Sequence, residues 1–245
     1  MGGLFYNLGR RTGAALRKGK WVVRSLTGSE SEVIQAEFEV GRDMAQALEQ
    51  EVEIDSDAAI ARLLGEVGTR LASRLTNRER RFTLRCVRSP EVNGFALPGG
   101  FIYLTRGLLE LCGWDRDQAA FILGHEMAHV VRGHAMDRII NSSVVTLASR
   151  MPVAAGPMRH RVVELGLGLL HQAYSQDQEL EADSFGVRLA RSAGFNALAA
   201  IDVLKRLREK GDAAGGSGLA GYFSSHPPIE LRIAELNRLR RRKVV

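Results

Sequence analysis

The segment His125-Glu126-Met127-Ala128-His129 lies in a stretch, from Asp115 to Val131, whose residues have the spacing of one amphipathic helix. Asp115 can cap the start of that helix, with Gln118 three residues later to complete a capping box. Histidines four residues apart share one helix face, with Cβ atoms about 5–6 Å apart, so both imidazoles can reach one ion. The glutamate between them leans over the same face, where it can take a proton from water activated by the metal. The segment therefore predicts a metal site with its own general base.

A third metal ligand is expected from another part of the chain, because catalytic zinc usually takes three protein ligands and keeps a fourth position open. Residues 176–191 again have helical periodicity. Within them Glu179 and Asp183 lie four apart and share one face, while Glu181 points elsewhere. One carboxylate can bind the metal, and the other can fix the free N–H of a ligand histidine. A solvated acidic helix turn is the alternative.

Four motifs between residues 93 and 233 resemble, in their order, the HtpX, CAAX-prenyl-protease and mitochondrial OMA-type family of gluzincin metallopeptidases. They are the strand–turn–strand sequence of residues 93–108, the segment 125–129, Glu179-x-x-x-Asp183, and Ser225-His226-Pro227-Pro228 with Arg232-Ile233 after it. The resemblance implies a zinc-dependent endopeptidase with one zinc ion per chain. It implies that His125, His129 and Glu179 are the zinc ligands and that Glu126 is the general base.

His226 has two functional interpretations, which rest on the resemblance more than on spacing. It can stabilise the oxyanion of a tetrahedral intermediate, or occupy the open metal position and hold the enzyme latent. A histidine that caps the last helix is the alternative. Tyr174 is another candidate oxyanion donor, and Arg232 can pair with Asp183, with a substrate carboxylate or in a surface salt bridge. The remaining histidines lack partners at a useful spacing and are interpreted as structural: His134, His160 and His171.

The residues before the active-site helix predict a small sheet. Residues 81–88 alternate apolar and basic side chains, which is typical of a half-buried strand. Residues 93–97 and 101–105 predict two more strands, joined by Pro98-Gly99-Gly100. An exposed edge of this sheet would offer N–H and C=O groups to an extended substrate. The candidate substrate-binding residues are Asn93, Gly94, Phe95 and Ala96, and a plain hairpin that packs on the helix is the alternative.

The order of elements predicts an α+β zincin domain of gluzincin type, mostly helical, with a small mixed sheet packed on the active-site helix. We expect a basic N-terminal segment at residues 1–28 and a single metallopeptidase domain at residues 29–245. Within that domain, residues 29–76 form a helical N-terminal part and residues 77–245 the catalytic core. The weak periodicity of residues 141–156 indicates a connector or a mobile flap over the cleft.

Composition is that of an ordinary soluble globule, with 45% hydrophobic and 25% charged residues. No apolar run approaches the roughly 18 residues of a membrane span, and no secretory signal is recognisable, so a cytoplasmic location is expected. Residues 1–28 hold six basic residues and no acidic one, against a net charge of +6 for the whole chain. This segment can be a solvated tail, lie on an anionic membrane surface, or dock over the catalytic groove. Nucleic acid is not an expected partner, because no reading motif accompanies the charge.

The leading hypothesis is zinc-dependent hydrolysis of peptide bonds within polypeptide substrates, with protein quality control as a candidate setting. The rival is a metal-stabilised chaperone or adaptor, or a latent form, that binds unfolded segments without cutting them. The intact Glu126 argues against this rival, because a binder needs no general base. The two cysteines have no metal-type spacing, and Cys86 is expected to be a small buried thiol. The oligomeric state is left open.

Overall fold

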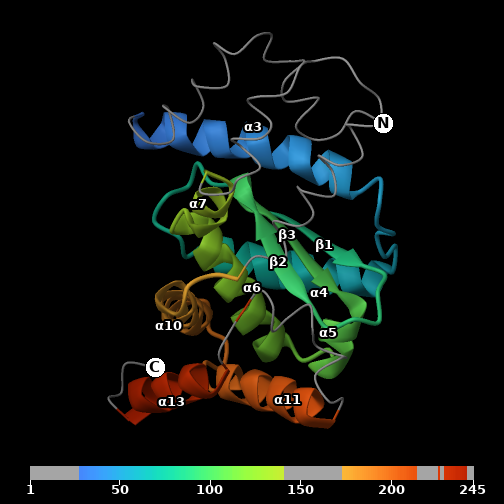
Figure 1. Cartoon of the computed structure of the whole chain (residues 1–245), viewed down its shortest axis with the longest axis vertical. Coiled ribbons are helices and arrows are strands. Elements are labelled where there is room, and N and C mark those ends of the chain that lie inside the picture. Colours follow the sequence, from blue (N-terminus) through green and yellow to red (C-terminus); the bar gives the residue numbers. More distant parts are fainter. Residues whose placement is uncertain (1–27, 141–172, 214–225, 227–228, 242–245) are drawn as a thin grey trace.

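The computed structural model describes residues 28–140, 173–213, 226 and 229–241. Its sheet has three strands, β1 (Thr83–Val87), β2 (Gly94–Leu97) and β3 (Phe101–Thr105), in the order β1-β3-β2. β1 pairs with β3 in parallel and β2 pairs with β3 antiparallel, so the sheet is mixed. A 3-10 turn, η1 (Pro98–Gly100), joins β2 to β3. Helices surround the sheet (Figure 1), which confirms the predicted α+β class.

Helix α3 (Glu30–Leu48) covers one face of the sheet. It begins with a capping box between Ser29 and Glu32. Its apolar stripe packs in one cluster with side chains of β2 and β3 that point to this face: Val40, Met44, Ala45, Leu48, Phe95, Leu97, Phe101 and Tyr103. Gly41 allows the helix to touch η1, because a Cβ there would lie 1.7 Å from the carbonyl oxygen of Pro98. α3 therefore fixes the turn at the end of β2.

The opposite face of the sheet packs on α4 (Ala58–Ala72) and α6 (Arg116–Val131). Asp57 caps α4 by accepting from the N–H of Ala59, and Asp115 caps α6 by accepting from the N–H of Gln118. The expected amphipathic character of α6 is wrong. Every residue from Gln118 to Val130 is buried, because the sheet, α4, α10 and α11 surround the helix.

The remaining helices are α5 (Arg106–Leu111), α7 (His134–Ile140), α10 (Gln176–Ser192), α11 (Ala199–Ala213) and α13 (Ile229–Arg241). α10 packs along α6, while α11 and α13 lie on the side of the molecule away from α3 (Figure 1). The apolar positions expected for the last helix are buried: Ile229, Ile233 and Leu236. The core thus closes around α6, which carries the predicted metal ligands.

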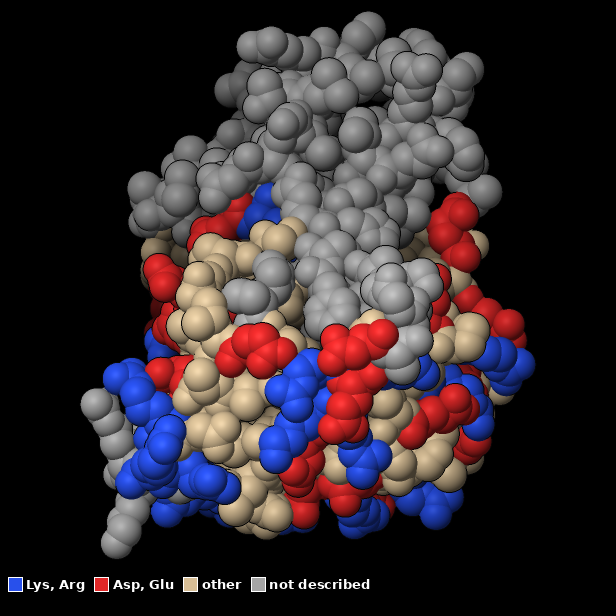
Figure 2. All heavy atoms as spheres, turned by 60° about the horizontal axis from the view of Figure 1, so that its bottom comes forward, with Lys and Arg blue, Asp and Glu red and all other residues tan. Residues whose placement is uncertain are grey.

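Charged side chains cover the surface formed around α11 and α13. Figure 2 shows Lys and Arg gathered where α13 ends, and the last turn of that helix carries Arg238, Arg240 and Arg241. Arg238 pairs with Glu235 at 2.7 Å. Basic groups at a helix C-terminus interact favourably with the helix dipole. These three arginines can therefore stabilise the end of α13.

Several expectations fall outside the described residues. These are the basic segment 1–28 except for its last residue, the connector 141–156, and the two histidines His160 and His171. In the part of the chain that the structure describes, no helix has the length and apolar character required to cross a bilayer.

Candidate metal centre

Four buried side chains converge at the middle of the molecule: His125, His129, Glu179 and His226. Their candidate ligand atoms all lie within 4.8 Å of one another. The Nε2 atoms of His125 and His129 are 3.1 Å apart. Oε1 of Glu179 lies 3.3 Å from Nε2 of His129, and its Oε2 lies 3.7 Å from Nε2 of His125. Two helices and the segment before α13 therefore supply one group that can hold a metal ion.

The spacing of these atoms fits a tetrahedral ion. Ligand atoms at about 2.0–2.1 Å from tetrahedral zinc are separated from each other by about 3.3–3.4 Å. The separations of 3.1 Å between the two Nε2 atoms and 3.3 Å between Nε2 of His129 and Oε1 of Glu179 lie close to that value. Two imidazole nitrogens that face each other at 3.1 Å in a dry site also need a proton or a cation between their lone pairs. The donor set therefore fits zinc.

A glycine contact brings α10 close enough to α6. A Cβ on Gly186 would lie 2.8 Å from the backbone nitrogen of His125, and a Cβ on Gly124 would lie 3.0 Å from the carbonyl oxygen of Gly186. Any side chain at either position would push the helices apart. Sequence reasoning did not single out these glycines, although a glycine beside a predicted ligand was a usable signal for a close helix crossing.

Asp183 and Arg232 lie beside Nδ1 of His125, the ring nitrogen that does not face the other candidate ligands. Nδ1 of His125 lies 2.9 Å from Oδ1 of Asp183. Arg232 donates to both oxygens of Asp183, from Nε at 2.8 Å and from Nη2 at 2.7 Å. Its Nη1 lies 3.0 Å from Oε2 of Glu179. Arg232 is fully buried, so the alternative of a surface salt bridge is wrong.

Burial and charge shift the pKa values in this cluster. Burial opposes ionisation of Glu179, yet His226, Arg232 and His125 hold its pKa well below the usual range. Burial likewise opposes ionisation of Asp183, and Arg232 keeps its pKa lowered. Burial also lowers the pKa of His129 far below normal. Burial acts in the same sense on His125, but the charge of Glu179 and the hydrogen bond with Asp183 leave its pKa raised. Both carboxylates are thus ionised at neutral pH, and His129 is in the neutral form that binds metals.

Glu126 faces the space between the cluster and β2. Its Oε2 is buried and has no hydrogen-bond partner among the described residues, and its Oε1 lies 3.7 Å from Nε2 of His226. A Cβ on Gly94 would lie 3.7 Å from Oε1 of Glu126 and only 3.0 Å from the side chain of Leu104. A glycine in β2 therefore lets the strand pass close to this carboxylate.

His226 contacts both the cluster and β2. Its Nδ1 lies 2.9 Å from Oε1 of Glu179, and its Nε2 lies 3.3 Å from the carbonyl oxygen of Gly94. Tyr174 lies at the same centre, with its ring stacked on that of His129 at 3.6 Å and 10°. The Tyr174 hydroxyl is buried and has no hydrogen-bond partner in the described ranges.

The candidate substrate residues lie on an edge strand, as expected, but Gly94 to Leu97 are buried rather than exposed. Asn93 accepts from the N–H of Thr105 at 3.0 Å. Because bonded and non-bonded pairs alternate in an antiparallel ladder, Gly94 and Ala96 direct their backbone groups away from β3. The N–H of Gly94 donates to Oδ1 of Asn93. The backbone of Ala96 and the carbonyl of Gly94, which faces Nε2 of His226, therefore point away from β3.

The expectation that His134 lacks partners is wrong. Its Nδ1 lies 3.1 Å from Nδ1 of His129, and its Nε2 lies 3.4 Å from Oε2 of Glu181. Glu181 points away from the metal ligands, as expected, and also binds Nε of Arg132 at 2.9 Å. The contact was missed because a spacing of five residues does not place two side chains on one helix face.

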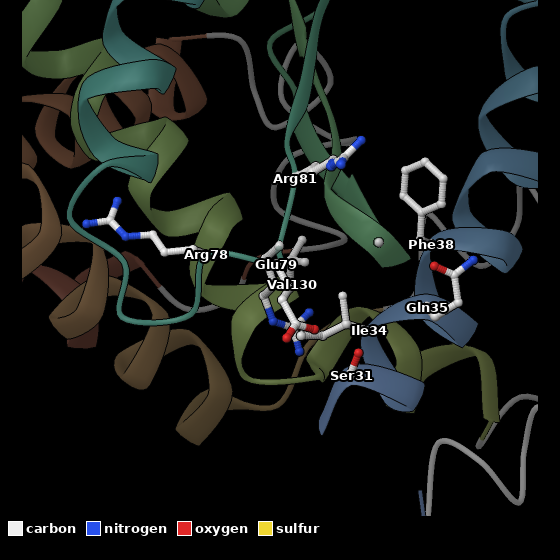
Figure 3. Close-up of a pocket in the computed structure, with 10 residues that line it drawn as sticks. Ser31, Ile34, Gln35, Phe38, Arg78, Glu79, Arg81 and Val130 are labelled. Atoms are coloured by element: carbon white, nitrogen blue, oxygen red, sulfur yellow. The ribbon is translucent and has the colours of Figure 1, made fainter. Parts of the chain in front are cut away.

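A separate cavity of about 340 Å³ lies under α3. Figure 3 shows Ile34, Gln35 and Phe38 of α3 around it, with Glu79 and Arg81 from the segment before β1. The cavity is lined by none of the predicted site residues. It is therefore distinct from the metal cluster.

Comparison with known proteins gives a family match. The profile of peptidase family M48 matches residues 59–240, from the start of α4 almost to the end of α13. The chain is 35% identical over 162 residues to the mitochondrial metalloendopeptidase OMA1 of Schizosaccharomyces pombe, a match that covers 64% of this chain and 46% of that protein. It is 31% identical to a protease HtpX homolog of Thiobacillus denitrificans, with coverage of 60% and 62%. It is 26% identical to the metalloprotease YcaL of Escherichia coli, with coverage of 56% and 54%. The chain thus spans less than two thirds of the length of each of these relatives.

Proposed function

Because this chain belongs to peptidase family M48, we propose that it is a zinc-dependent endopeptidase that hydrolyses peptide bonds within polypeptides. The observation that carries the proposal is the convergence of two histidines, two acids and a third histidine at one buried point beside an edge strand. His125, His129 and Glu179 would hold the metal. Zinc bound there acts as a Lewis acid that polarises a carbonyl and makes water a better nucleophile at neutral pH.

Glu126 is proposed as the general base. Its unpartnered, buried Oε2 is available to accept a proton from the attacking water and to pass it to the nitrogen of the leaving amine. Desolvation strengthens every electrostatic interaction of this carboxylate with the reacting atoms. Glu126 takes the proton from water and then gives it to the amine, so the reaction needs no second general acid.

Asp183 is proposed to orient His125. Its carboxylate accepts from Nδ1 of His125, which leaves Nε2 with a lone pair directed at the other ligands. Arg232 neutralises Asp183 and fixes it from two directions. The pair therefore keeps the histidine in the ligand tautomer.

Substrate is proposed to lie extended along residues Asn93 to Ala96. The carbonyl of Gly94 and the backbone of Ala96 point away from β3, so they can bind a peptide strand by main-chain hydrogen bonds. Gly94 lies next to Glu126 and His226, which would place a bound peptide bond near the base. His226 is proposed either to stabilise the oxyanion or to occupy the fourth metal position in a latent form, since it contacts Glu179 at 2.9 Å.

The variant Glu126→Gln tests the proposal. It should keep its zinc, because Glu126 is not among the ligands, and lose casein cleavage by a factor of about 10²–10⁴. Zinc content by elemental analysis and cleavage by the purified chain, with and without a chelator, are the two measurements. Glu209→Gln is the matched control, since Glu209 is an exposed acid on α11.

A Glu126→Gln chain that still cleaves casein at the wild-type rate would end this mechanism. The rival function, binding of unfolded segments without cutting, predicts that the wild-type chain suppresses aggregation but leaves casein intact. The names of the relatives favour the peptidase. Protein quality control is kept as the proposed setting.

Residues 1–28 are proposed to make peripheral contact with an anionic membrane, because six basic residues stand there with no acidic one. Equal co-sedimentation with anionic vesicles by chains with and without this segment would contradict the proposal. The cytoplasmic location stays a prediction, since one relative is named as a mitochondrial protein.

A further inference from the structure

Nδ1 of His129 faces another histidine, whereas Nδ1 of His125 faces a carboxylate. Nδ1 of His129 faces Nδ1 of His134 at 3.1 Å, and Nε2 of His134 faces Oε2 of Glu181 at 3.4 Å. His129 is fully buried and His134 is 5% exposed. We infer that His134 and Glu181 are positioning residues, which fix the tautomer and the ring of His129 through a hydrogen bond from His129 to His134 and a close contact from His134 to Glu181. The inference rests on the proposed role of His129 as a metal ligand.

Counting protons sets the direction of these two contacts. A neutral imidazole carries one N–H, and a metal ligand uses the other nitrogen as a lone pair. If His129 binds metal through Nε2, its Nδ1 carries the proton and donates to Nδ1 of His134. His134 must then carry its own proton on Nε2, where Oε2 of Glu181 accepts it. The opposite direction would put a proton on Nε2 of His129, which points at Nε2 of His125, and would block the metal.

The local fold explains why His134 can reach His129. Gly133 has a φ of +78°, in the left-handed region that favours glycine, and it ends the run of α6. α7 starts directly after it, and the N–H groups of Met136 and Asp137 donate to the carbonyl of Gly133. This turn brings the side chain of His134 back onto the last turn of α6. A continued helix would have pointed it elsewhere.

One helix, α10, therefore serves both histidines. Asp183 accepts directly from His125, and Glu181, two residues earlier, reaches His129 only through His134. The carboxylate of Glu181 is 44% exposed and is anchored by Arg132 at 2.9 Å. His134 lies between Glu181 and His129, so this half-exposed carboxylate can orient the buried His129 ring. Tyr174 stacks on the face of the same ring at 3.6 Å, so His129 is held at its edge and on its face.

Zinc affinity of the full chain, by competition with a chromophoric chelator, tests the inference. His134→Leu removes the acceptor and should weaken zinc binding about 10–100-fold, as loss of such outer partners typically does. His134→Asn places Oδ1 near the position of Nδ1 and should recover most of the affinity. Glu181→Ala should weaken binding, whereas the control Asp177→Asn, an exposed acid on the same helix, should leave it unchanged.

The tautomers are a second readout, which does not depend on any variant folding. Long-range ¹H–¹⁵N NMR of the zinc-loaded wild-type chain should find the protons on Nδ1 of His129 and on Nε2 of His134. A proton on Nδ1 of His134, or wild-type zinc affinity in His134→Leu, would overturn the inference. Equal losses in His134→Leu and His134→Asn, with both variants folded by circular dichroism, would also overturn it.

The proposed function fails by a different result. A wild-type chain that binds zinc but never cleaves casein would contradict the peptidase and leave the affinity comparison intact. A wild-type chain that cleaves casein while His134→Leu binds zinc normally would contradict only the positioning role.

Discussion

Arg232 is among the largest fully buried side chains of the described residues, and it lies between two carboxylates. A buried charge is tolerated only when partners replace the lost water, and removal of one member leaves the others uncompensated. Arg232 makes two bonds to Asp183 and one close contact with Glu179. These three side chains are therefore coupled, and their contacts position Glu179, a candidate metal ligand, without an ion.

The two cysteines differ from Arg232, because burial keeps their side chains uncharged. Burial raises the pKa of Cys86 to about 11 and that of Cys112 to about 12. Both are free, buried thiols, which agrees with the prediction for Cys86. The thiol form is therefore favoured at neutral pH, and the thiol is a weaker nucleophile than the thiolate.

Asp55, away from the metal cluster, should make stability depend on pH. The N–H of Asp57 and the guanidinium of Arg106 bind its carboxylate, at 3.0 and 2.9 Å, and hold its pKa below the usual range. A folded pKa below the unfolded value means that the contribution is present at neutral pH. It is lost as pH falls below about 3.9 and through the folded value.

The comparison of wild type with Asp55→Asn measures this effect. The difference in free energy of unfolding, from urea titrations, should be constant near neutral pH and should shrink below about pH 4. A difference that stays the same down to about pH 3 would show that Asp55 does not titrate as its contacts imply.

At the scale of elements, the crossing of α6 and α10 builds the metal cluster. Gly124 and Gly186 leave no room between the two backbones, so residues on facing turns can share one ion. Glu179 and Asp183 come from the face of α10 that meets His125. The helix pair, more than either helix alone, forms the site.

Gly186→Ala should therefore destabilise the chain by about 1–3 kcal/mol, because its Cβ would meet the backbone of His125 at 2.8 Å. The displaced helix should also weaken zinc binding. Gly65→Ala is the control, since nothing lies within 4 Å of a Cβ there and the position is exposed on α4. That change should stabilise the chain by about 0.5–1 kcal/mol. Urea unfolding that ranks the two variants equally would contradict the packing argument.

At the scale of the whole molecule, the candidate ligands connect parts of the chain that are far apart in sequence. Side chains of α6 and α10 meet His226 at one point, and the sheet and α3 lie on the side of the molecule away from α11 and α13 (Figure 1). The family match begins at residue 59, so α3 lies outside it, although it packs on side chains of β2 and β3. The division of the domain at residue 76 stays a prediction.

Zinc should therefore stabilise the entire fold. An ion that binds only the folded chain adds about 2.7 kcal/mol to the free energy of unfolding when its free concentration is 100 times its dissociation constant. Unfolding of the wild-type chain with zinc and with excess chelator should show this gain. Glu179→Gln should lose most of it, and Glu209→Gln should keep it.

Identical unfolding curves with and without zinc would contradict a resident metal. A full zinc effect in Glu179→Gln would instead remove Glu179 from the ligand set. Either result is independent of the cleavage assay.

The class of fold, and the pairs of side chains that share one helix face, could be predicted from the amino-acid sequence. Spacings of four residues in 125–129 and 179–183 encode shared helix faces, and alternation encodes strands, because both patterns depend only on local backbone geometry. The structure brings these residues together, and the α+β class is confirmed.

The contacts around those side chains became visible only in the folded chain. The burial of α6 on all sides, the Gly124–Gly186 contact and the link from Glu181 through His134 to His129 were not predicted. The pairing of Arg232 with Asp183 was one of three alternatives, and the structure selects it. Each depends on the distance and angle between two elements, which packing of the whole core sets and which no spacing within one element records.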